Sequence, residues 1–210
     1  MKLILMLGEG MIVSVQLFLL TLLFAIPLGL VVAFGRRSKS YIIRGITGIY
    51  ISIMRGTPLM LQLVAVFYGP YYIYEGKIDR FAAAIIAFTL NYAAYFAEIY
   101  RGGIESIPKG QYEAGEVLGF TRPQVFFKII LPQVVKRILP AISNEVITLV
   151  KDTALATVIG VSEMFRVTNN EMSRIASIRP LFVAGGFYYI MNLIVAQLFK
   201  FTEKKLNYYR

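Results

Sequence analysis

The sequence predicts an all-α integral membrane protein, because it is strongly apolar and holds several long uncharged runs. The 210 residues are 57% hydrophobic, with a mean hydropathy of +0.64, which exceeds that of ordinary soluble domains. A helix needs roughly 20 apolar residues to cross the hydrocarbon core of a bilayer. Four runs without Asp, Glu, Lys or Arg approach that length: residues 10–35, 56–74, 81–97 and 180–199.

We therefore expect five transmembrane helices in a single domain that covers residues 1–210. The fifth candidate, at about 137–151, carries one acid, Glu145. The first apolar run is longer than the core of a signal peptide and lacks a small-residue cleavage site, so we expect it to remain as a helix, kinked at Pro27. The expected spans are about 10–35, 57–73, 81–101, 134–151 and 180–200.

The segment that follows the first span is expected to lie along the membrane surface. Residues 38–54 are amphipathic and too charged at their start to cross a bilayer, which is typical of an interfacial helix. Thr57 and Pro58 then interrupt the chain. Since proline near a helix start costs no hydrogen bond, the second span is expected to begin there.

Residues 102–132 are polar and basic, and they are expected to form a helix–turn–helix. A short helix from Gln111 to Leu118 is expected to stop at Gly119, since glycine accepts the left-handed conformation. Thr121 and Gln124 have the spacing of a capping box for a second helix, which should end before Pro132.

Charge distribution predicts the orientation and argues against a nucleic-acid partner. The net charge is +10, and most basic residues fall in the segments that share a side with the carboxyl terminus. The positive-inside rule therefore places the amino terminus outside and the carboxyl terminus in the cytoplasm of a cell-membrane protein. The chain has no cysteine and no histidine, which excludes thiol chemistry and the commonest metal ligand.

Several short motifs occur in order along the chain: Arg55 to Pro58, Ala97 to Ile104, Ile107 to Gln111, Glu113-Ala114-Gly115 with Gly119, Leu131 to Gln133, and Lys151 to Leu155. Together and in this order they resemble the polar amino-acid permeases of ABC importers, whose EAA loop docks on an ATPase. The chain departs from that family at Gly115, where alanine is usual, and at Ala154, where serine is usual.

The resemblance implies a MetI-like permease fold and a division of labour between subunits. It implies two ATPase subunits that bind ATP and Mg, a second permease chain identical or related to this one, and an extracytoplasmic substrate-binding protein. No G-x4-G-K-[ST] loop occurs in the chain, so we expect no ATP hydrolysis and no cofactor on this subunit.

The resemblance also assigns the docking residues of the 110–132 loop. It implies that Glu113 pairs with a basic group on the ATPase, and that Ala114 and Gly119 permit close approach. Glycine is about 1 kcal/mol less favourable than alanine inside a helix, so Gly115 predicts a less tight turn. The expected docking set is Glu113, Ala114, Gly115, Gly119, Phe120 and Arg122.

Polar residues within or beside the expected spans are candidates for the substrate path, because such groups are costly in a membrane and are usually functional. Glu145 could face the path or bond to a neighbouring helix. Asn91 could bind the backbone groups of an amino acid or join two helices. Asp152 could instead only pair with Lys151, and Glu98 with Arg101 could be a gate or an ion pair within one helix.

The apolar piece from Thr153 to Ser162 is too short to span and could be re-entrant. It would then point Thr157 and Glu163 into the pore, where a carboxylate favours a cationic side chain; otherwise Glu163 is a surface acid. The function expected from all of these features is the permease subunit of an ATP-driven importer for polar, basic amino acids. The alternative is a self-contained channel or secondary carrier.

Overall fold

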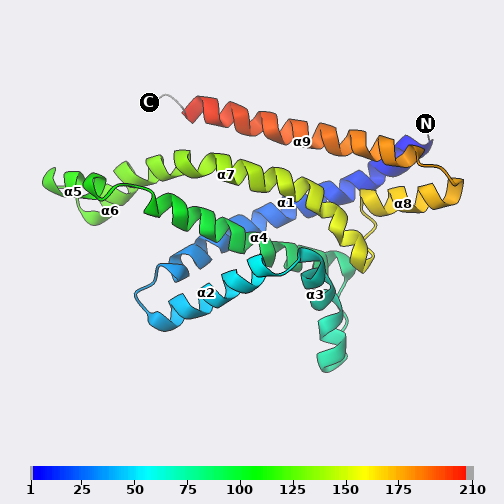
Figure 1. Ribbon diagram of the computed structural model, residues 1–210, viewed down its shortest axis with the longest axis horizontal. Coiled ribbons are helices and arrows are strands. Elements are labelled where there is room, and N and C mark those ends of the chain that lie inside the picture. Colours follow the sequence, from blue (N-terminus) through cyan, green and yellow to red (C-terminus); the bar gives the residue numbers. More distant parts are fainter. Residues whose placement is uncertain (1, 207–210) are drawn as a thin grey trace.

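The computed structural model describes residues 2–206, which form helices without a single strand among them (Figure 1). Four of these helices are long: α1, α4, α7 and α9. The elements in chain order are α1 (Lys2–Arg36), α2 (Tyr41–Gly56), α3 (Leu59–Tyr74), α4 (Arg80–Glu105), α5 (Lys109–Val117), α6 (Arg122–Val125), the π-helical turn η1 (Phe126–Ile130), α7 (Leu131–Asp152), the 3-10 helix η2 (Thr153–Ile159), α8 (Met164–Ile175) and α9 (Arg179–Leu206).

Helix α4 lies at the centre of the fold, and α9 lies at its edge. In the most apolar 18-residue stretch of each helix, more than half of the residues are buried in α4 but only 17% in α9. The face of α4 that meets α1 is rich in alanine, and Gly29 of α1 approaches so closely that a Cβ atom would lie 2.8 Å from the Cβ of Phe96. Small residues thus let the backbones of α1 and α4 approach, which is how helices pack in membranes.

Within residues 2–206, three helices are long and apolar enough to cross a bilayer by themselves, namely α1, α4 and α9. The pair α2 and α3 meets the same test only as one broken span, because its two halves meet at 110°. Helix α7 carries charges at both ends, including Lys136 and Lys151. All five expected spans coincide with helices, and the number that crosses the membrane stays a prediction.

The predicted break at Thr57 and Pro58 is confirmed. Helix α2 ends at Gly56, Thr57 and Pro58 are extended, and α3 begins at Leu59. A polar network closes this break: the Asn91 amide donates to the Met54 carbonyl at 3.0 Å and to the Gln62 side chain at 2.9 Å. The backbone groups freed by the break are therefore satisfied by side chains from α3 and α4, as a membrane setting requires.

The prediction that the second helix of the loop stops before Pro132 is wrong. Helix α6 runs through η1 directly into α7, with Pro132 in the first turn of α7. Proline cannot donate the usual helical hydrogen bond, and its ring clashes with the carbonyl four residues earlier. A π-helical turn changes the backbone spacing at this point, so the chain stays helical where the proline pattern predicts an end. Likewise, α4 continues to Glu105 instead of ending near residue 101.

Candidate functional site

A polar cavity of about 410 Å³ lies between the α2–α3 break, α4, α7 and η2. It brings together three of the predicted path residues: Asn91, Glu145 and Asp152. Its lining contains two carboxylates and no basic side chain, so we call it the acidic cavity. The lining residues are Thr57, Pro58, Leu59, Asn91, Tyr92, Tyr95, Glu145, Thr148, Asp152 and Leu155.

The two carboxylates share one face of α7 because they are seven residues, or two turns, apart. Asp152 accepts a hydrogen bond of 2.7 Å from the hydroxyl of Tyr92, so its partner is on α4 and not the neighbouring Lys151. Glu145 makes no hydrogen bond with any residue that the structure describes. The cavity therefore contains one oriented carboxylate and one whose oxygens are available to a ligand.

Asn91 joins helices, as one of its two predicted roles required. Its amide nitrogen is fully used by Met54 and Gln62 at the α2–α3 break. The residue is only 5% exposed, yet it belongs to the lining of the acidic cavity. Asn91 thus fixes the wall of the cavity, and only its side-chain oxygen can take part in binding.

The placement of Glu163 in a pore is wrong, and so is its alternative placement on the surface. Glu163 is completely buried, and its carboxylate caps the start of α8 by accepting from the backbone N–H groups of Phe165 at 2.6 Å and Arg166 at 2.7 Å. The Tyr188 hydroxyl of α9 lies 3.3 Å from the same carboxylate. Burial raises the pKa of Glu163 to about 7, and the two backbone donors only partly offset this effect.

Thr157 is also absent from the lining of the acidic cavity. It lies in η2, a 3-10 helix, and its carbonyl accepts a hydrogen bond from Arg166 at 3.3 Å. The apolar piece is therefore a short helical element whose first half faces the cavity through Leu155. Gly160 ends it with a φ of 83°, a conformation that glycine adopts without strain.

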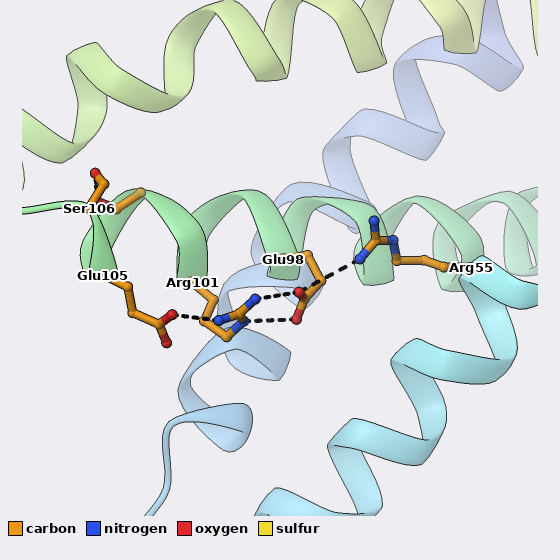
Figure 2. Close-up of polar contacts among 6 residues, drawn as sticks. Arg55, Glu98, Arg101, Glu105 and Ser106 are labelled. Carbon is orange, nitrogen blue, oxygen red and sulfur yellow. Dashed lines mark hydrogen bonds and ion pairs between the residues drawn. The ribbon is translucent and has the colours of Figure 1, made fainter.

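The predicted pair of Glu98 and Arg101 is the centre of a larger ion-pair network (Figure 2). The Arg101 guanidinium holds both Glu98 oxygens, at 3.0 and 2.7 Å, and also contacts Glu105 at 2.5 Å. Arg55, in the last turn of α2, reaches Glu98 from the other side at 3.6 Å. The ion-pair interpretation is confirmed, and the network also ties α2 to α4.

The segment from Lys109 to Ile130 folds as a compact helical hairpin, formed by α5, α6 and η1. It packs on an apolar cluster separate from the main core, built around Ile104, Ile107, Val125 and Ile130. The predicted capping box is present, with the Thr121 backbone N–H donating to the Gln124 side chain at 2.9 Å.

Two glycines shape this hairpin. Gly119 has a φ of 77°, and the Phe120 N–H reaches back to the Gly115 carbonyl at 3.1 Å, so α5 ends as predicted in a Schellman turn. Gly115 is buried, and a Cβ atom there would lie 2.7 Å from Cγ2 of Val125. The expectation of a looser turn is therefore wrong, because the missing side chain lets α5 and α6 pack closely.

The outer face of the hairpin offers an exposed carboxylate beside apolar side chains. Glu113, Ala114 and Arg122 are exposed, whereas Gly115 and Phe120 turn toward the hairpin's own core. Val117 and Leu118, which are 88% and 72% exposed, were not among the predicted docking residues. Their position just before Gly119 could have indicated a contact surface, because adjacent exposed apolar residues are typical of interaction sites.

Arg55, Tyr92 and Tyr95 were also missed as site residues. Asn91 was available as a marker for Tyr95, since a position four residues further along a helix lies on the same face, whereas Tyr92, the next residue, gave no such signal. Arg55 gave no separate signal beyond its motif, because its contacts depend on how α2 packs on α4. Among residues 2–206, no group of three or more acidic side chains is arranged to hold a metal ion.

A helical membrane chain with a partly open polar cavity and a projecting hairpin has the architecture of a transport subunit. Residues 25–208 match the family of the binding-protein-dependent transport system inner membrane component, and the chain belongs to this family. The resemblance to amino-acid ABC permeases and the MetI-like permease fold are thereby confirmed.

Two relatives from Bacillus subtilis (strain 168) show how far the similarity extends. The chain is 37% identical to the L-cystine transport system permease protein TcyB, over 97% of this chain and 87% of that protein. It is 38% identical to the arginine transport system permease protein ArtQ, over 95% of this chain and 91% of that protein. A crystal structure of an amino acid ABC transporter with histidines has a TM-score of 0.88 at 31% identity, over 95% of this chain and 94% of that one.

Proposed function

We propose that this chain is the membrane permease subunit of an ATP-driven importer for amino acids with cationic side chains. It forms the translocation path by alternating access, and the acidic cavity is the site where the substrate is held. The relatives that transport arginine and cystine are consistent with an amino-acid substrate, and the charge of the cavity supports the cationic class.

One observation carries the substrate class: Glu145 and Asp152 face the same cavity, and no basic residue lines it. Carboxylates at membrane depth are costly unless a positive charge compensates them. An amino acid with a basic side chain brings two positive groups and one negative group, which matches two carboxylates and a neutral polar wall. The two carboxylates of α7, and not Glu163, therefore favour a basic substrate.

Coupling to ATP hydrolysis is proposed to pass through the helical hairpin. Its exposed carboxylate and apolar tip suit a cleft on an ATPase, and its buried Val125 and Ile130 pack in one apolar cluster with residues of α4 and α7, which fixes the hairpin to those helices. The hairpin is continuous with α7 through η1, and the Arg137 side chain of α7 also donates to the Ser106 carbonyl at the end of α4. Movement of the hairpin would therefore reach the two helices that carry most of the cavity.

The complete transporter would contain this chain with an identical or related permease, two ATPase subunits that bind ATP and Mg, and an extracytoplasmic binding protein. The amino terminus would lie outside and the carboxyl terminus in the cytoplasm. This arrangement places the hairpin on the side of the ATPases.

Reconstitution tests the proposal directly. The permease is purified with its ATPase, placed in liposomes with the binding protein, and supplied with labelled arginine or with citrulline, its uncharged isostere. We expect ATP-dependent accumulation of arginine and little of citrulline. Equal uptake of both would refute the cationic class, and uptake without ATP or an ATPase would instead indicate a self-contained carrier.

A further inference from the structure

Arg55 lies at the boundary between the ion-pair network and the acidic cavity. It is in the last turn of α2, two residues before Thr57, which lines the cavity. Its guanidinium lies 5.4 Å from the ring centre of Tyr95, another lining residue, and 3.6 Å from Glu98 in the network. Figure 2 shows the Arg55 side chain extended from α2 toward Glu98 on α4.

The contact between Arg55 and Glu98 is the weakest in the network. Arg101 already holds both carboxylate oxygens of Glu98 with shorter hydrogen bonds, and Arg55 shares one of these oxygens at the longer distance. The Arg55 side chain is 45% exposed, and ion pairs with that exposure contribute about 1 kcal/mol or less. Glu98 therefore keeps its charge compensated when Arg55 moves away.

Glu145 lies on the cavity side of Arg55. It lines the same cavity as Tyr95, whose ring the Arg55 guanidinium contacts, and it makes no hydrogen bond with any described residue. The Tyr95 ring lies under the Arg55 guanidinium and borders the cavity, so it offers a cation–π surface between the two carboxylates.

We propose that Arg55 is a tethered counter-ion that exchanges between Glu98 and Glu145, and so competes with the positive group of the substrate. With substrate in the cavity, Arg55 rests on Glu98; when the substrate leaves, Arg55 turns to Glu145 and compensates one of the two carboxylates of the empty cavity. This inference rests on the proposed function, because it assigns a specificity-determining role beside the same cavity. Arg55 sets how tightly a cationic amino acid binds and closes the cavity to other cations.

The proposal predicts a particular pattern in a double-mutant cycle of Arg55 and Glu98. The probes are arginine and citrulline, and the measurement is equilibrium binding to the purified permease–ATPase complex in lipid nanodiscs without the binding protein. Arg55→Gln removes the charge that competes with the substrate. It should strengthen arginine binding about fivefold, which corresponds to the free energy of one exposed ion pair. Glu98→Gln releases Arg55 toward Glu145 and should weaken arginine binding by a similar factor.

The double variant distinguishes exchange from simple charge removal. If Glu98 acts only through Arg55, Glu98→Gln changes nothing in the Arg55→Gln background, so the two effects are not additive. Glu105→Gln is the matched control, because it removes a carboxylate from the same network two turns beyond Glu98 on α4 and should leave arginine binding unchanged. Citrulline binding should be similar in all variants.

Additive effects of the two substitutions would overturn the exchange, because they would show two independent charges acting at a distance. Shifts of both single variants in the same direction would also overturn it, and would indicate that the pair only holds α2 on α4. If the wild-type complex binds arginine no better than citrulline, the proposed substrate class fails, and the inference fails with it. The first two outcomes contradict the inference alone.

Discussion

The helical hairpin and the acidic cavity differ in which groups they turn inward. The hairpin buries apolar side chains around Val125 and Ile130 and leaves Glu113 and Arg122 exposed. The cavity does the opposite, because Asn91, Glu145 and Asp152 face an interior space. The first arrangement makes a rigid body that can dock on a partner, and the second makes a site that selects a ligand by charge. Substitutions in one region should therefore leave the function of the other intact.

Charge reversal on the hairpin should have the largest effect. Glu113→Arg places a cation where a carboxylate is expected to meet a basic group of the ATPase, so we expect loss of the ATPase on purification and loss of ATP-driven uptake. Glu9→Arg is the control, since Glu9 is also exposed but belongs to the amino-terminal part of α1, and the amino terminus lies at the opposite end of the molecule from α5 and α6 (Figure 1). Retention of the ATPase by the Glu113 variant would contradict the docking role.

Neutralising one carboxylate of the cavity should abolish selection by charge without affecting docking. Glu145→Gln should weaken arginine binding about thirtyfold, in line with about 2 kcal/mol for a close charge pair that loses one member. Equilibrium binding of arginine and citrulline measures this, with recovery of the ATPase as the check on folding. Unchanged arginine affinity would place the substrate elsewhere.

Overpacking the hairpin should destabilise it without changing substrate binding. Gly115→Val inserts a side chain where a Cβ already meets Val125, and overpacking of this kind costs about 1–3 kcal/mol. Gly110→Val is the matched control, because Gly110 is in the same helix and has no atom within 4 Å of its Cβ position. Thermal unfolding by circular dichroism should show a lower midpoint only for the Gly115 variant, and equal midpoints would refute the close packing.

Replacing Glu163, the buried acid that caps the start of α8, should change how the stability of the protein depends on pH. It should leave arginine binding in the cavity unchanged. Burial raises the pKa of Glu163 from 4.5 to about 7 in the folded chain, so the folded state prefers the protonated acid. Its contribution is therefore complete below pH 4.5 and is lost as the pH rises through about 7. The wild type should lose stability over this window, whereas Glu163→Gln should show a flatter profile and unaltered arginine binding.

Local signals predicted the hairpin better than the cavity. The capping box at Thr121 and the turn at Gly119 each depend on residues a few positions apart, and both are confirmed. The helix end predicted at Pro132 is wrong because the π-helical turn η1 keeps the chain helical there, and no pattern of single residues indicates such a turn. The hairpin was thus predictable except where two helices join.

The cavity depends on contacts between distant segments. Glu163 was misplaced because its burial requires α9, which contributes Tyr188 from 25 positions away. Arg55 was overlooked because its partners Glu98 and Tyr95 lie on α4, 40 or more positions along the chain. Asn91, Glu145 and Asp152 were found because a polar group within an apolar run is itself a signal. That they line one cavity depends on how α4 packs against α7, which the sequence pattern does not show.

The most direct test of the central claim is an experimental structure of the complete transporter with arginine bound. The account predicts density for the amino acid in the acidic cavity, with a positive group of arginine within hydrogen-bonding distance of Glu145 or Asp152, and the helical hairpin seated on the ATPase. Arginine bound at any other place in the permease, with the cavity left to water or lipid, would contradict the account.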